Sequence, residues 1–447
     1  MDWIKFLDKI DSIVWGPPLL ILLMGTGIFL SFRLGFLQVF RLPTALKLII
    51  KAENEGSGDV NSFGALCTAL AATIGTGNII GVGTAIKAGG PGALFWMMMA
   101  AFFGMATKYA EGLLAIKFRA KDANGQITGG PMQYILKGMG EKFRPLAVFF
   151  AVSGVLVALL GIGTFPQVNA IVTSINGTFN IPVAITGIIL TIIVALIIFG
   201  GLQSITNVST KVIPFMSILY IIICLITVLS SYDKIPQAIK LILSNAFTGT
   251  AAAGGFLGAT VQMAIRNGIA RGIFSNESGL GSAPIAAAAA KTKWPAEQGL
   301  ISMTGTFIDT IIICTLTGLS IIITGVWKTD LQGAELSQAA FGTVIPVLGP
   351  ALLTLSLTLF AFTTIIGWNY YGERCCEFLF GVKSIRIYRI IFIAMVALGA
   401  FIKLEAIWLI ADIVNGLMTL PNLIALVALS GVTAAETKLY MKYLKNK

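Results

Sequence analysis

The chain has 447 residues, of which 56% are hydrophobic and 11% charged, and it carries a formal net charge of +11. Soluble globular proteins carry roughly 25% charged residues, so this composition excludes a water-soluble enzyme. The mean hydropathy is +0.88. Apolar runs of about twenty residues are long enough to cross the hydrocarbon core as helices, and they predict an all-α polytopic membrane protein. A β-barrel would instead show short alternating segments.

The chain contains no histidine, which removes the commonest catalytic acid–base group and metal ligand. The five cysteines lie in apolar segments without the spacing of metal ligands. We therefore expect no enzyme and no cofactor. In a membrane protein the positive charge is best explained by basic cytoplasmic loops, and we expect no binding to nucleic acid.

Eleven apolar segments are long enough to span the membrane. Their approximate bounds are 15–38, 62–87, 92–117, 145–175, 181–200, 209–231, 253–290, 298–325, 350–380, 386–403 and 405–437. About 18 lysines and arginines fall on one side of this arrangement and about 7 on the other. The basic side is expected to be cytoplasmic. This places the N-terminus outside the cell membrane and the C-terminus inside.

Two of these segments contain clusters of glycine that disfavour a continuous helix. One cluster is Gly75-Thr76-Gly77-Asn78, and the other lies within residues 272–281. The clusters are five segments apart, so they fall in helices of opposite direction. This pattern is typical of an inverted five-helix repeat with a substrate site between broken helices. We predict repeats at 62–231 and 232–447, with 1–61 forming an extra helix and a loop. Close helix packing through small residues is the alternative explanation.

Residues 89–104, GGPGALFWMMMAAFFG, resemble the signature of the alanine or glycine:cation symporter family, except that Met98 stands in place of the usual tryptophan. Residues 265–289 resemble the same family. The resemblance implies a sodium-coupled carrier of alanine and glycine. It also implies the leucine-transporter type of fold, found in the amino acid–polyamine–organocation superfamily.

The first glycine cluster resembles the unwound point of the first core helix in the bacterial leucine transporter. This resemblance implies a sodium site formed by carbonyl and hydroxyl oxygens. The implied ligands are the carbonyls of Ala71, Ile74 and Phe360 and the hydroxyls of Thr363 and Thr364. The alternative for the two threonines is a hydrogen bond to their own helix backbone.

A small amino acid offers a carboxylate, an ammonium group and a short side chain. Freed N–H groups at Gly75, Thr76, Gly77 and Asn78 would suit the carboxylate, although Asn78 could simply cap the break. The carbonyls near Gly272 to Ser275, Thr364 and the side-chain oxygen of Gln167 would suit the ammonium group. The Gln167 amide could equally serve the carboxylate, and an ordinary interhelical bond is the other alternative for it. Phe274 and Trp368 would form a wall beside the side chain, unless they serve only in packing.

Ionisable residues within membrane segments are functional candidates. Here they are Arg266, Arg271, Glu277, Asp309, Glu373, Arg374, Glu377 and Asp412. Their number permits internal pairing, for instance of Arg271 with Glu277 across the second break, either as a gate of the pathway or as a static strut. A proton-coupled carrier using Glu277 or Asp309 is the alternative to sodium coupling. A channel or an intramembrane enzyme is less favoured. The expected partners are the amino acid, sodium and the lipid bilayer, and the carrier is expected to work as a single chain.

Overall fold

The computed structural model describes residues 3–51, 55–248, 260–346, 348–402 and 405–446. These residues are almost entirely helical and include one small antiparallel hairpin, formed by β1 (Ala120–Lys121) and β2 (Ile127–Thr128). The predicted all-α polytopic fold class is confirmed.

The helices follow one another closely along the chain. In the first half they are α1 (Trp3–Val14), α2 (Pro17–Arg33), α3 (Leu37–Phe40), α4 (Leu42–Lys51), α5 (Ser62–Thr73), α6 (Val82–Gly89), α7 (Gly92–Lys117), α8 (Pro131–Tyr134), α9 (Arg144–Leu160), α10 (Phe165–Phe179), α11 (Val183–Phe199) and α12 (Gly201–Leu229). In the second half they are α13 (Ile235–Thr248), α14 (Val261–Asn276), α15 (Ala283–Ala287), α16 (Pro295–Thr306), α17 (Thr315–Thr324), α18 (Gly333–Gly342), α19 (Leu348–Phe380), α20 (Ser384–Gly399), α21 (Glu405–Ala428) and α22 (Ser430–Asn446). The described residues also include the π-helical segments η1 (Gly77–Gly81), η2 (Ile135–Met139) and η6 (Phe307–Cys314). They include the short 3₁₀ turns η3 (Glu141–Phe143), η4 (Tyr232–Lys234) and η7 (Val326–Lys328).

Each of the eleven predicted spans contains at least one helix. Among the described residues, 7 helices are long and apolar enough to cross a membrane, or 8 if the bent pair of α5 with η1 and α6 is one span. The remaining predicted spans are either short, as α11 with 17 residues and α20 with 16, or interrupted, as α14 and α15. Residues 253–259 of the seventh predicted span lie outside the described part of the chain.

The first predicted break is present between α5 and η1. Asn61 caps the start of α5 by accepting a hydrogen bond from the Gly64 N–H at 2.6 Å. The helix ends at Thr73, Ile74 takes an extended conformation, and the chain resumes at Gly77 with a bend of 53°. The glycines therefore do interrupt the span.

The second predicted break follows α14. Glu277 adopts a left-handed conformation with φ of 56°, and the turn continues through Gly279 and Gly281 at φ of 93° and 83° before α15 begins. Positive φ is readily accessible to glycine and costly for most other residues. The two glycines therefore explain why the chain can turn here inside the protein.

A third interruption, between α9 and α10, was not predicted by the sequence analysis, which treated 145–175 as one segment. The helix stops at Leu160 and restarts at Phe165, with Pro166 in its first turn. Gly163 approaches Trp368 so closely that a Cβ atom there would lie 2.7 Å from the Cβ of Trp368. The interruption brings α10 against α19 and so helps to position the site.

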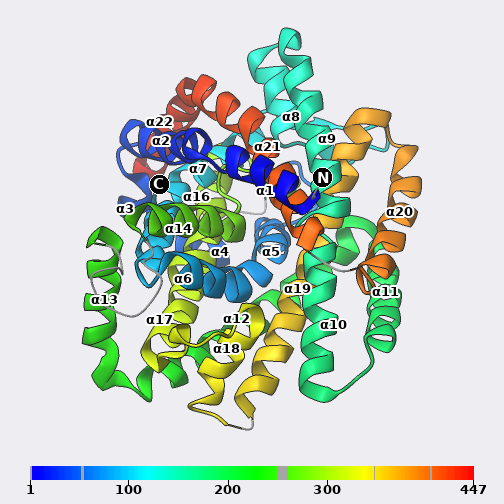
Figure 1. The fold of residues 1–447 in the computed structure, drawn as a ribbon. Coiled ribbons are helices and arrows are strands. Elements are labelled where there is room, and N and C mark those ends of the chain that lie inside the picture. The colour runs from blue at the N-terminus through cyan, green and yellow to red at the C-terminus, as the bar shows by residue number, and fades with distance from the viewer. Residues whose placement is uncertain (1–2, 52–54, 249–259, 347, 403–404, 447) are drawn as a thin grey trace.

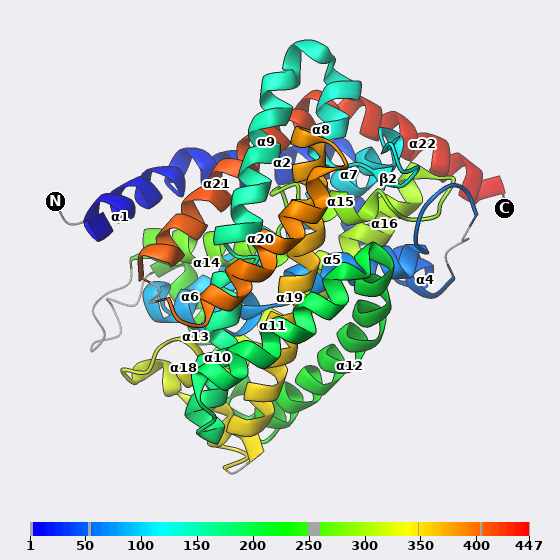
Figure 2. The same ribbon diagram turned by 90° about the vertical axis from the view of Figure 1, so that its right-hand side faces the viewer.

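The helices form a bundle around α7, which packs against both α14 and α16. α19 contacts α5, α9 and α10, while α11 and α20 pair at one edge of the bundle (Figure 1). α1 and α22 project at opposite ends of the molecule (Figure 2). This arrangement places both broken helices and α19 in the interior.

Candidate functional site

The two helix breaks meet in the centre of the bundle. A Cβ atom at Gly77 would lie 3.0 Å from the Cα of Ser275 and 3.4 Å from the ring of Phe274. Only glycine allows the backbones to approach so closely. Gly77 and Ser275, predicted from separate segments to share one site, therefore do lie together.

A cluster of oxygen atoms joins the first break to α19. The Thr364 hydroxyl donates to the Ile74 carbonyl at 3.2 Å and to the Phe360 carbonyl at 3.0 Å. The Thr363 hydroxyl donates to the same Phe360 carbonyl at 3.0 Å. Both threonines thus make the back-bonds that were the alternative to ion binding. Thr364 nevertheless also reaches across to the break, as a shared cation site would require.

Close packing of α5 on α19 supports this cluster. A Cβ atom at Gly367 would lie 2.8 Å from the backbone nitrogen of Ala72, which follows Ala71. A Cβ atom at Gly75 would lie 2.5 Å from the Thr364 hydroxyl. Side chains at either glycine would separate the helices. Four of the five predicted ligands, Ile74, Phe360, Thr363 and Thr364, are in one network, and Ala71 lies one turn before Ile74.

Gln167 supports the first break from α10. Its side-chain oxygen accepts from the Thr76 N–H at 3.3 Å, and its amide nitrogen donates to the Thr76 hydroxyl at 3.1 Å and to the Ile162 carbonyl at 3.0 Å. Asn78 accepts from the Gly75 N–H at 2.9 Å. The freed N–H groups of Gly75 and Thr76 are therefore satisfied by side chains, and Asn78 does act as a cap.

Asp309 connects both breaks to the π-helical segment η6. Its carboxylate accepts from the Asn78 amide at 2.7 Å, the Ser275 hydroxyl at 3.0 Å and the Thr310 hydroxyl at 2.6 Å. Cys314 lies beside this group, with its sulfur 3.3 Å from the Ser275 hydroxyl. All three donors suit an ionised carboxylate, which only accepts hydrogen bonds.

Glu277 does not pair with Arg271, so the pairing considered from the sequence was wrong. The Glu277 carboxylate accepts from the Trp368 ring nitrogen at 2.9 Å and from the Ser282 hydroxyl at 2.5 Å. Arg271 instead forms an ion pair with Asp412 on α21 at 3.0 Å. The left-handed turn that begins at Glu277 directs its side chain into the bundle, away from the face of α14 that carries Arg271.

Two buried residues of α7 were missed by the sequence analysis. The Glu111 carboxylate accepts from the N–H groups of Gly279 and Gly281 at 3.2 and 3.1 Å and from the Asn422 amide at 2.6 Å. The Lys108 ammonium group donates to the Asn276 carbonyl at 2.9 Å. Both hold the second break from the same side. Their signal in the sequence was a lysine and a glutamate three residues apart inside the apolar segment 92–117.

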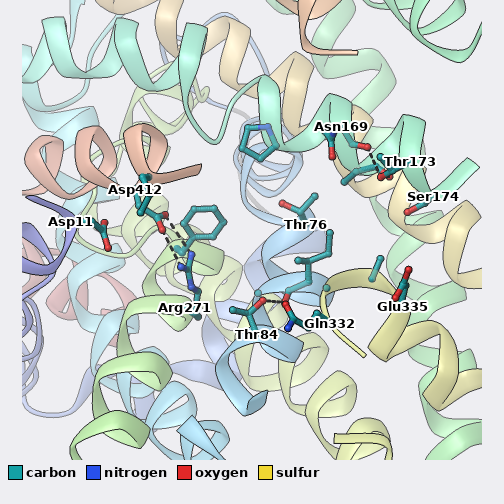
Figure 3. A pocket seen from close by; sticks show the side chains of 18 of the residues that line it. Asp11, Thr76, Thr84, Asn169, Thr173, Ser174, Arg271, Gln332, Glu335 and Asp412 are labelled. Atoms are coloured by element: carbon teal, nitrogen blue, oxygen red, sulfur yellow. Dashed lines mark hydrogen bonds and ion pairs between the residues drawn. The ribbon is translucent and has the colours of Figure 1, made fainter. Parts of the chain in front are cut away.

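A cavity of about 1080 Å³ reaches the site from one side of the bundle. Thr76 and Phe274 lie at its inner end, and Arg271 and Asp412 face Asn169 and Thr173 across it (Figure 3). The Phe274 ring packs beneath the Arg271 guanidinium group at 5.5 Å. Trp368 is fully buried and does not line this cavity. Of the predicted substrate residues, Thr76 and Phe274 are the two that line the cavity.

The opposite side of the site is closed by backbone hydrogen bonds. The N–H of Lys291 donates to the Val60 carbonyl at 2.8 Å, and the N–H of Val60 donates to the Ala289 carbonyl at 3.1 Å. Arg119 donates to the carbonyls of Ala288 and Ala290 at 3.0 and 2.7 Å. The start of α5 and the segment after α15 are thus tied together beyond the site.

The comparisons with known proteins agree with this arrangement. The whole chain, residues 1–447, matches the family model described as the sodium:alanine symporter family. An "uncharacterized transporter" of Haemophilus influenzae is 57% identical, covering 99% of this chain and 97% of that protein. The sodium/alanine symporter AgcS of Methanococcus maripaludis is 49% identical, covering 100% of this chain and 99% of that protein.

A solved structure shares the fold. The crystal structure of MhsT in complex with L-phenylalanine matches with a TM-score of 0.60 at 10% identity, covering 86% of this chain and 99% of that one. The predicted fold type and the predicted family are both confirmed. The chain therefore belongs to the sodium:alanine symporter family, as a multi-pass membrane protein that acts as a sodium-coupled amino acid symporter and not as an enzyme.

Proposed function

We propose that this symporter imports alanine and glycine by alternating access, with one sodium ion bound between α5 and α19. The observation that carries the proposal is the contact of Thr364 with the Ile74 carbonyl at 3.2 Å, directly at the first break. An ion held by both would join a broken helix to its neighbour. The amino acid is proposed to bind beside it, at the backbone of Gly75–Asn78, near Gln167 and Ser275.

The buried charges favour a cation as the coupling species. Glu111, Glu277 and Asp309 are each 0% exposed, and Lys108 interacts electrostatically with all three. Buried charge without compensation is costly in a low-dielectric interior. Sodium would add positive charge here. A proton carried by Glu277 or Asp309 is the second candidate, because one oxygen of each carboxylate contacts only hydroxyl groups, which can accept as well as donate.

The cavity and the closed side support alternating access. A cavity reaches Thr76 and Phe274 from one side, whereas the Val60 and Ala290 backbones close the other. Transport in this scheme would require the Val60 and Arg119 hydrogen bonds to break while the cavity closes. Arg271 and Asp412 lie where such closure would occur.

The test is uptake of labelled alanine into proteoliposomes under an imposed sodium gradient or an imposed proton gradient. We expect the sodium gradient alone to drive accumulation, with exchange stimulated by unlabelled alanine inside. Accumulation driven by protons without sodium would favour the second candidate. Flux without counterflow would indicate a channel.

Thr364 tests the cation site. Thr364→Ala should raise the sodium concentration needed for half-maximal uptake about tenfold, because a ligand to a charged group is lost. The alanine affinity at saturating sodium should change much less, and Thr364→Ser should be mild. Thr358→Ala is the matched control, because Thr358 lies on the same helix and its hydroxyl has no hydrogen-bond partner among the described residues. If Thr363→Ala and Thr364→Ala both kept wild-type sodium dependence, the ion would bind elsewhere.

Trp368 and Phe274 test the substrate wall. We expect leucine and phenylalanine to compete poorly with alanine, because extra methylenes in a tight pocket cost about 1–3 kcal/mol. Phe274→Ala should admit larger side chains in a competition assay, because Phe274 lines the cavity. Trp368→Phe keeps a ring away from the cavity and loses only the bond to Glu277, so it should leave the range of accepted side chains unchanged and serves as the control. Equal competition by leucine and alanine in the wild type would refute this pocket.

We also propose that the N-terminus is outside the cell and the C-terminus inside. The proposal is supported by the excess of lysine and arginine in the loops on the side of the C-terminus. Cysteine substitutions at Lys5 and Lys445 should therefore differ in intact cells. An impermeant thiol reagent should label position 5 and spare position 445, and the reverse pattern would invert the topology.

A further inference from the structure

A basic groove lies between α2 and α22 and shares no lining residue with the cavity at the candidate site. It has a volume of about 470 Å³, and it is lined by Arg33, Leu34, Ala434, Thr437, Lys438, Met441, Lys442 and Lys445. Lys438, Lys442 and Lys445 are spaced by four and three residues, so they share one face of α22. Arg33 ends α2. Four cations from two helices thus surround one groove.

These four cations are not neutralised within the described part of the chain. The acidic side chain nearest in sequence, Glu436, pairs with Lys117 at 2.6 Å. Arg33 lies 5.6 Å from the ring of Phe29. The ring carries no net charge, so this contact does not neutralise the guanidinium group. Like charges brought together repel one another, so this groove is suited to an anionic ligand.

The groove continues onto an apolar surface of α2. Ile21, Phe29 and Phe32 are 70%, 39% and 68% exposed and lie on one side of this membrane-spanning helix. The stripe leads directly to Arg33. A ligand that combines a negative head with long apolar chains would contact both surfaces, whereas a soluble anion would contact only the groove.

We propose that this groove binds the head group of an anionic glycerophospholipid, with its acyl chains along Phe29 and Phe32. The groove is on the side of the bundle where α7 ends, because Lys117 at that end pairs with α22. This is also the side proposed above to be cytoplasmic. Basic pockets between helices on the cytoplasmic side are suited to such head groups. The lipid would fasten α22 to α2 and so stabilise the C-terminal end.

The test uses delipidated full-length protein in detergent. Phosphatidylglycerol should raise the thermal unfolding midpoint more than phosphatidylcholine with the same acyl chains. The combined variant Arg33→Gln, Lys438→Gln and Lys442→Gln should weaken the apparent affinity for phosphatidylglycerol on the order of a hundredfold, because three cations near the phosphate are lost.

The matched control is Lys211→Gln, Lys383→Gln and Arg386→Gln. It removes the same charge from exposed positions on the same proposed side and should keep the phosphatidylglycerol response. Equal losses in both variants would show a diffuse charge effect and overturn the site. An equal response to phosphatidylcholine, or to glycerol 3-phosphate alone, would also overturn it. If the triple variant does not fold, Lys442→Glu with native mass spectrometry of retained phosphatidylglycerol gives the same decision.

Discussion

Interrupting a helix inside a membrane protein frees backbone N–H and C=O groups where water cannot satisfy them. In this chain the groups freed at the first break are bonded by Asn78 and Gln167, and one freed carbonyl accepts from Thr364. The second break is held by Glu111 and Asn422. The buried polar side chains of α7, α10, α19 and α21 therefore serve the two breaks.

The side chains that bond the two helix breaks include several ionisable groups in the interior. Glu111, Glu277 and Asp309 are fully buried, and Lys108 is the basic group that interacts with all three. Buried carboxylates are maintained when donors and cations surround them. A core that carries more negative than positive side chains is suited to receive a cation, and the proposed sodium site lies on the neighbouring face of the same break.

The broken helices are packed differently on the two sides of the site. Towards the cavity, α14 contributes Arg271 and Phe274, which face open space and the α21 residue Asp412. Beyond the site, the start of α5 and the segment after α15 share a backbone bridge at Val60 and Ala290. The two sides of the site therefore differ, because one opens into a cavity and the other is held by backbone hydrogen bonds.

The sequence alone determined the helical membrane fold, the family and the positions of both breaks. The length of an apolar segment predicts a membrane helix, and a glycine cluster predicts a break in it. Both are local properties, so they do not depend on how the helices pack against one another. The structure joins Ile74, Phe360, Thr363 and Thr364, named from the sequence, in one hydrogen-bond network, and their role as sodium ligands stays a prediction.

Only the tertiary structure decided which charged groups meet. Arg271 pairs with Asp412, 141 residues away, and the left-handed turn at Glu277 sends that carboxylate to Trp368 instead. Glu111 and Lys108 reach the second break because α7 packs against α14, and the interruption before α10 allows Gly163 to lie close to Trp368. Such pairings depend on how whole helices are oriented relative to one another. Neither residue spacing nor hydropathy specifies that orientation.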